Sequence, residues 1–130
     1  MNRPAKFFRW LSAIALAGIC ACSSQAGKPQ TAASTAQAAE SARVAPVVEK
    51  YKKQGVLTGF DFKGTTTLVV FADTEKYSEL DDSLEESMKS DLLASWSSAW
   101  KRNHPHQHAK LYVIFQNYYG QEITRLQKQL

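Results

Sequence analysis

Residues 83–103 read SLEESMKSDLLASWSSAWKRN, and this stretch decides the fold. Large apolar side chains recur at every fourth position: Leu84, Met88, Leu92, Trp96 and Trp100. An α-helix has about 3.6 residues per turn, so this spacing places them on one face. Acidic residues crowd the start of the stretch and basic residues end it, as the helix dipole favours. The pattern predicts a long amphipathic helix whose two tryptophans supply much of a hydrophobic core.

Two runs rich in β-forming residues precede this helix, VLTGFDF at 56–62 and TTTLVVFA at 65–72. Lys63 and Gly64 separate them, which is typical of a β-hairpin. A further run, AKLYVIFQ at 109–116, follows the helix. The residues Asn117, Tyr118, Tyr119 and Gly120 predict a turn with the glycine in a left-handed conformation. Residues 121–126 are then expected to form the last strand.

Upstream of the hairpin, Pro46 suits the first turn of a helix, and Gly55 suits its end. We therefore expect a short helix just after residue 44. The predicted fold is α+β, with a short helix followed by ββαββ. The four strands are expected to form an antiparallel sheet with the long helix across one face. Tyr112 and Ile114 then lie on the opposite face, which is either covered by the short helix or exposed to a partner.

The N-terminal segment has a different character. Arg3, Lys6 and Arg9 precede an apolar run of 13 residues, from position 10 to position 22. A membrane-spanning helix needs about 20 residues, so the run is too short for a permanent span. A basic start followed by a short apolar run is typical of a cleavable export signal. A hydrophobic helix retained in the fold is the alternative, and the basic residues argue against it.

The end of this run, Ile19-Cys20-Ala21-Cys22, resembles the lipobox of bacterial lipoproteins. The resemblance implies cleavage before Cys22 and a diacylglyceryl group on its sulfur. Cys20 is the competing acceptor, but bulky Ile19 stands before it where a small residue is expected. The resemblance also implies a membrane anchor, because two or more acyl chains give stable attachment. By the same resemblance, Ser23 after the acceptor implies the periplasmic face of the outer membrane.

The chain then divides into three parts. Residues 1–21 are the predicted signal peptide, and residues 22–43 are the lipidated cysteine and a tether. The tether is rich in Ala, Ser, Thr and Gln, has no aliphatic residue larger than alanine between positions 23 and 43, and is expected to be disordered. Residues 44–130 form the predicted α+β domain. It resembles small lipoprotein domains of proteobacteria, a resemblance that implies no specific activity.

Charge and cysteine content limit the functions of the domain. Three of the 16 Lys and Arg residues lie in the signal segment, which leaves 13 against 12 Asp and Glu. This balance gives no support to nucleic-acid binding. The chain has two cysteines, Cys20 and Cys22, so the exported domain has no thiol for a disulfide or a nucleophile. No nucleophile–base or phosphate-binding motif is convincing, and we do not expect an enzyme.

His104, His106 and His108 are the only histidines of the chain, and they alternate. In an extended segment they lie on one side, which is compatible with zinc, copper or nickel. Pro105 restricts this segment, and a closed zinc site takes four ligands, so a solvated loop is the simpler interpretation. The acidic residues between 73 and 91 fit helix-start stabilisation, and they are also able to attract a basic partner.

The sequence thus predicts a tethered lipoprotein of the cell envelope that acts by binding, as an accessory or scaffold component. Its partners are the membrane, through the lipid, and an envelope protein. The expected contact surface is the sheet face with Tyr112 and Ile114, or the Tyr118-Tyr119 tip. No cofactor is expected beyond the covalent lipid on Cys22. A divalent-metal protein using the three histidines is the alternative, and a small hydrolase or enzyme inhibitor is a remote third.

Overall fold

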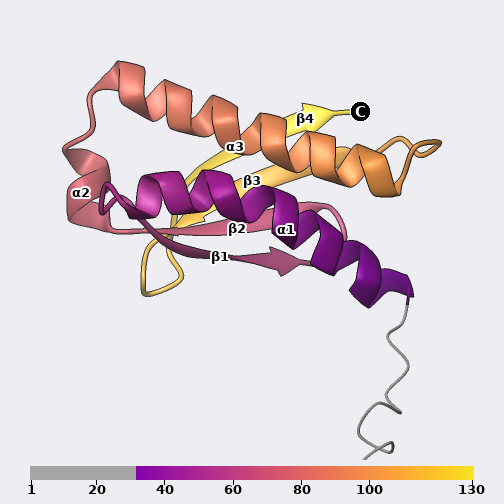
Figure 1. The fold of residues 1–130 in the computed structure, drawn as a ribbon. Helices are drawn as coiled ribbons and strands as arrows, with labels where there is room; N and C mark the ends of the chain where they lie inside the picture. The colour runs from indigo at the N-terminus through magenta and orange to yellow at the C-terminus, as the bar shows by residue number, and fades with distance from the viewer. Residues whose placement is uncertain (1–31) are drawn as a thin grey trace, which may run out of the picture. The chain divides into compact units, whose positions relative to one another are not determined.

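A computed structural model of the chain describes residues 32–130, which form one compact unit. The predicted signal peptide, Cys22 and residues 23–31 of the predicted tether lie outside the described residues. The elements follow in the order α1 (Ala32–Lys52), β1 (Leu57–Lys63), β2 (Thr67–Ala72), α2 (Thr74–Ser78), α3 (Asp82–Asn103), β3 (Lys110–Gln116) and β4 (Glu122–Gln129). Figure 1 shows α1 and α3 side by side over the same face of a four-stranded sheet.

The α+β class, the four strands and the long helix are confirmed, but the antiparallel sheet is wrong. The strand order is β1-β2-β3-β4, and the central pair β2 and β3 is parallel, so the sheet is mixed. The two outer pairs, β1–β2 and β3–β4, are antiparallel as predicted. The cause is the connection: the 22 residues of α3 span about 33 Å, enough to carry the chain back along the sheet. β3 therefore starts at the same end as β2.

The first helix is much longer than predicted. α1 has 21 residues and begins at Ala32, so residues 32–43 are helical and the prediction of a disordered tether is wrong for them. Pro46 lies inside α1, not in its first turn. Its missing N–H leaves the carbonyl of Ala42 without a helical donor, but both residues are exposed, so water can solvate that carbonyl. A second unpredicted feature is α2, a five-residue helix between β2 and α3.

α1 ends in a Schellman motif. The N–H of Val56 donates to the carbonyl of Tyr51 at 3.2 Å, and the N–H of Gly55 donates to Lys52 at 2.9 Å. Gly55 has a φ of 78°, a left-handed conformation that glycine adopts without strain. The motif turns the chain directly into β1.

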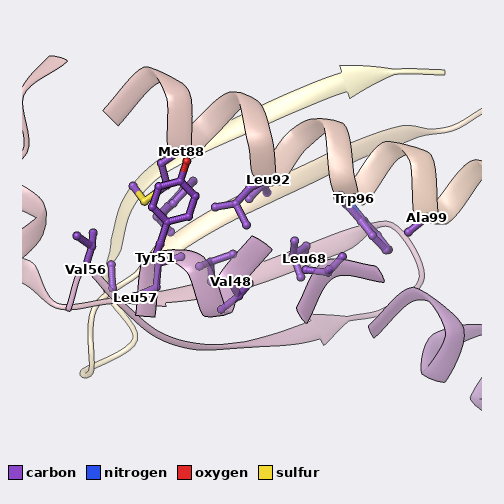
Figure 2. Close-up of a cluster of buried hydrophobic side chains, with 14 of the residues drawn as sticks. Val48, Tyr51, Val56, Leu57, Leu68, Met88, Leu92, Trp96 and Ala99 are labelled. Atoms are coloured by element: carbon purple, nitrogen blue, oxygen red, sulfur yellow. The ribbon is translucent and has the colours of Figure 1, made fainter. Parts of the chain in front are cut away.

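The core fills the space between the two helices and the sheet. Figure 2 shows Val48 and Tyr51 of α1 pointing toward Met88 and Leu92 of α3, and Leu68 of β2 belongs to the same buried cluster. All five side chains are at most 1% exposed. The predicted apolar stripe of α3 is confirmed, since Met88, Leu92, Trp96 and Trp100 are buried and Leu84 is partly buried.

Buried polar atoms of the core find partners. The indole N–H groups of Trp96 and Trp100 donate to the carbonyls of Thr66 and Thr65 in the β1–β2 turn, at 3.4 and 2.9 Å. The Tyr51 hydroxyl donates to Asp91 Oδ2 at 2.7 Å and thereby joins α1 to α3. These contacts fix the turn and α1 on α3, because an unpaired buried polar group is costly.

Candidate functional site

The turn between β3 and β4 presents the two large apolar side chains that are most exposed among the described residues. Tyr118 and Tyr119 are 92% and 85% exposed. Their rings contact each other edge to face, with centroids 5.6 Å apart. This is the Tyr118-Tyr119 tip that the sequence predicted as one of two partner surfaces.

Asn117 organises the backbone of the tip. Its Oδ1 accepts hydrogen bonds from the N–H groups of Tyr119 at 3.0 Å and Gln121 at 2.9 Å. Its own N–H donates to the Gln121 carbonyl at 2.9 Å, and its Nδ2 donates to Gln121 Oε1 at 2.9 Å. Gly120 takes a φ of 78°, which confirms the predicted left-handed position. The tyrosines are therefore held outward by an ordered turn, which lowers the conformational entropy lost on binding.

A groove of about 600 Å³ lies beside the tip and is lined by Tyr118, Tyr119, Thr58, Asp73, Thr74 and Glu75. This volume falls in the range of roughly 300–1,000 Å³ that is usual for ligand sites. Its lining includes two aromatic rings, two hydroxyl groups and two carboxylates. We call this surface the tyrosine groove.

The charge of the tyrosine groove is negative. Asp73 and Glu75 form no ion pair with another residue of the described part, 32–130. Asp73 Oδ1 accepts from the N–H of Lys76 at 2.9 Å and caps α2. The ammonium of Lys76 pairs at 3.3 Å with Glu79, the residue that follows α2. Two carboxylates beside two exposed phenol rings suit a cationic ligand, because aromatic faces and carboxylates both attract positive charge.

The sheet face that was the other predicted partner surface does not present an apolar patch. α1 lies on the same side as α3, yet Ile114 is only 7% exposed and its cross-strand neighbour Val69 only 6%. Arg125 places its guanidinium 5.8 Å from the centre of the half-buried Tyr112 ring. Glu122 holds that guanidinium through two hydrogen bonds of 3.0 and 2.8 Å. Tyr112 and Ile114 are therefore much less exposed than Tyr118 and Tyr119, and Tyr112 already packs against a charged side chain.

The three histidines do not converge. His104 caps α3, and its Nδ1 lies 3.0 Å from the Trp100 carbonyl, while His108 Nδ1 lies 3.1 Å from the backbone oxygen of Leu130. His106 is exposed between them. Within residues 32–130, no three His, Cys, Asp or Glu side chains gather closely enough to hold a metal ion. Metal binding by these histidines stays a prediction that this geometry does not support; calorimetric titration with zinc and nickel tests it.

Sequence reasoning missed a second polar site around Glu40, which it had assigned to the tether. The carboxylate is buried in α1, and its Oε1 lies 3.8 Å from His104 Nδ1. Its position continues the stripe of Val44, Val48 and Tyr51 upstream at helical spacing. That spacing is the signal that would have extended the predicted helix past residue 44.

The chain matches no protein-family model, no curated protein and no solved structure. No helix within residues 32–130 combines the length and apolarity needed to cross a membrane. The arguments for function therefore come from the N-terminal sequence pattern and from the geometry of the described residues.

Proposed function

We propose that this protein is a lipid-anchored lipoprotein of the bacterial envelope whose α+β domain binds a partner in the tyrosine groove. The anchor is the expected diacylglyceryl group on Cys22, and the expected site is the periplasmic face of the outer membrane. The lipobox-like end of the apolar run, Ile19-Cys20-Ala21-Cys22, supports this part of the proposal. The domain acts by binding, as an accessory or scaffold component, and not by catalysis.

The observation that carries the binding role is the pair of exposed tyrosines beside a groove of ligand size. Large exposed aromatic side chains are enriched at binding hot spots, where their burial contributes most of the affinity. Burying both rings removes on the order of 300 Å² of surface from water. The ordered turn at Asn117 and Gly120 keeps the rings presented before the partner arrives.

The chemistry of the tyrosine groove defines the partner. Asp73 and Glu75 favour a basic segment, and the phenol faces favour the side chains of lysine or arginine and apolar groups. We therefore propose an envelope protein that presents a basic segment with at least one apolar residue.

Site-specific photocrosslinking tests this function. A benzophenone amino acid at position 119 should give one discrete crosslinked partner in the native bacterium. The same amino acid at position 98, exposed on α3, should not. The partner purified from this crosslink should bind the Tyr118→Ser, Tyr119→Ser double variant at least tenfold more weakly than the parent chain. An identical crosslinking pattern from both positions would refute the proposed groove.

A matched charge test separates the groove from generic electrostatics. Asp73→Asn combined with Glu75→Gln should weaken binding and reduce its salt dependence, because both carboxylates line the groove. Asp82→Asn combined with Glu86→Gln changes the same net charge at exposed positions on α3 and should leave affinity within a factor of two. Equal effects of both pairs would mean that only the overall charge attracts the partner.

A further inference from the structure

A second, smaller cavity lies beside Glu40. It has a volume of about 130 Å³ and is bounded by α1, the β1–β2 turn and the end of α3. Its lining residues are Ala36, Gln37, Glu40, Gly64, Thr65 and His104. The volume is below that of sites for whole organic ligands but several times the roughly 30 Å³ of a water molecule. The cavity is therefore of a size to take one functional group at the end of a ligand.

Among the described residues that line this cavity, Glu40 alone carries a carboxyl group. Its side chain is 6% exposed, whereas that of His104 at the rim is 21% exposed. Oε1 accepts a hydrogen bond from Asn103 Nδ2 at 3.2 Å. Oε2 has no hydrogen-bond partner among residues 32–130. Every fully buried side-chain oxygen or nitrogen in that range has a partner, so Oε2 is not fully buried. Oε2 therefore borders open space, and the open space at Glu40 is the cavity.

Burial of this carboxyl disfavours its charged form. Burial raises the pKa of Glu40, and the Asn103 hydrogen bond and the nearby His104 oppose this effect only in part. Asn103 Nδ2 also donates to the Ala36 carbonyl at 3.0 Å, so the amide ties α1 to the end of α3 and orients the carboxyl. No Lys or Arg among the described residues pairs with Glu40. A buried acid that is oriented and has no Lys or Arg partner is suited to receive a cationic ligand.

His104 adds an imidazole ring to the lining of the cavity. His104 Nδ1 lies 3.0 Å from the Trp100 carbonyl, which can only accept, so Nδ1 carries the hydrogen and Nε2 of the neutral ring has a free lone pair. The His104 ring stacks on Trp100 with centroids 4.3 Å apart, which fixes its orientation. The carboxylate acceptor of Glu40 is complementary to a group that carries several N–H donors and a positive charge.

We propose that this cavity binds the cationic head group of a ligand, a guanidinium or a primary ammonium, with Glu40 as its counter-ion. When Glu40 is protonated, binding releases the carboxyl proton to solvent and an ion pair forms. His104 is the other ionisable group among the described residues that line the cavity. The remaining lining residues and the hydrogen-bond donor to Glu40 carry no titratable side chain: Ala36, Gln37, Gly64, Thr65 and Asn103. The proposal is independent of the partner in the tyrosine groove.

Methylguanidinium is the probe for this site, and N-methylurea is its neutral isostere. The ¹⁵N-labelled full chain in detergent micelles is titrated with each at pH 7.5. We expect methylguanidinium to shift the Asn103 side-chain amide and the Trp100 indole signals saturably, with a Kd in the millimolar range. N-methylurea should shift neither. Affinity should fall as the pH is lowered, because protonation of Glu40 removes the negative charge that the ligand pairs with.

Two variants and one control assign the binding to the cavity. Glu40→Gln keeps the acceptor for Asn103 but removes the charge, and it should weaken methylguanidinium binding at least tenfold. Ala36→Leu keeps the charge but fills the cavity, and it should do the same. Glu49→Gln makes the same chemical change at an exposed position of α1 and should leave the Kd within a factor of two. Unchanged affinity in both cavity variants, or equal binding of N-methylurea, would overturn the proposal.

The source of the head group is decided by a third ligand. If a partner's side chain fills the cavity, acetyl-Gly-Arg-Gly-amide should bind more tightly than methylguanidinium, because its backbone adds contacts at the rim. Equal or weaker binding of the peptide assigns the site to a small free cation. Failure of all three ligands to shift Asn103 or Trp100 would contradict the site itself and would leave crosslinking at position 119 unaffected.

Discussion

Val48→Ala tests whether α1 belongs to the folded domain or to a flexible tether. Val48 is 1% exposed and points into the core between α1 and α3 (Figure 2). The substitution removes two buried carbon groups, at about 0.8 kcal/mol each for transfer to water, and leaves a cavity. We expect a loss of about 2–3 kcal/mol in the free energy of unfolding. For a domain of this size that loss lowers Tm by roughly 10 °C or more.

Urea denaturation followed by circular dichroism at 222 nm measures this loss. The matched control is Val47→Ala, the adjacent position, where the side chain is only partly buried. Its expected cost is less than half that of Val48→Ala, and neither variant should change the slope of free energy against urea. A loss below about 1 kcal/mol at position 48, or equal losses at both positions, would refute the packing of α1 on α3.

Glu40, Asp91 and Gly120 each offer a further test of the described structure. The pKa of Glu40 is raised by burial, so the folded state binds its proton more tightly and stability falls as pH rises above the ordinary value of 4.5; Glu40→Gln should be more stable than the parent at pH 8 in urea titrations, and a less stable variant contradicts this. The pKa of Asp91 is lowered by the Tyr51 hydroxyl first and by Lys50 second, so its contribution is present above 3.8 and is lost as pH falls through its lower folded value. Tyr51→Phe should cost about 1 kcal/mol at pH 7 and less at pH 2, whereas a cost independent of pH would exclude the charge-assisted bond. Gly120→Ala should cost about 1–2 kcal/mol through backbone strain alone, since no atom lies within 4 Å of the added methyl group; an unchanged urea midpoint would mean that the turn at Gly120 is not left-handed.

The local patterns of the sequence predicted the elements well where periodicity and turn residues agreed. The fourfold spacing from Leu84 to Trp100 predicted α3 to within one residue at its start. The Lys63-Gly64 break and the turn ending at Gly120 predicted both antiparallel pairs. These signals are local, because each depends on residues that are close in the chain.

The sheet topology depends on a connection and not on any one strand. β2 and β3 look alike whether they pair in parallel or antiparallel, since both are apolar on two faces. The decisive fact was the single long helix between them, which returns the chain to the end of the sheet where β2 began. Treating the chain as two independent hairpins overlooked this return.

The start of the folded domain was predicted too late in the chain for a different reason. Residues 32–43 contain only small and polar side chains apart from Glu40 and Arg43, and such a composition is typical of disorder. It is also rich in alanine, the best helix former, and the packing of Val44, Val48 and Tyr51 on α3 provides the tertiary support. Glu40 was consequently missed, because a residue assigned to a tether was not tested as part of a buried site.

Site residues that are neighbours in sequence could be predicted, whereas those that only the fold brings together could not. Tyr118 and Tyr119 could be predicted from a turn with two aromatic residues before a glycine. Asp73 and Glu75 follow β2, and Tyr118 and Tyr119 follow β3. These residues line one groove because β2 and β3 are parallel, so both strands finish at the same end of the sheet. The alternation of His104, His106 and His108 suggested a common side, but their hydrogen bonds to Trp100 and Leu130 separate them.

Lipid anchoring at Cys22 is the part of the proposed function on which the envelope location depends. It can be measured by intact mass spectrometry of the protein purified from its native membrane. We expect a chain that begins at Cys22 and carries a diacylglyceryl group on the sulfur. A chain with an unmodified Cys22, or one that retains Met1 and the basic segment after it, would contradict the claim.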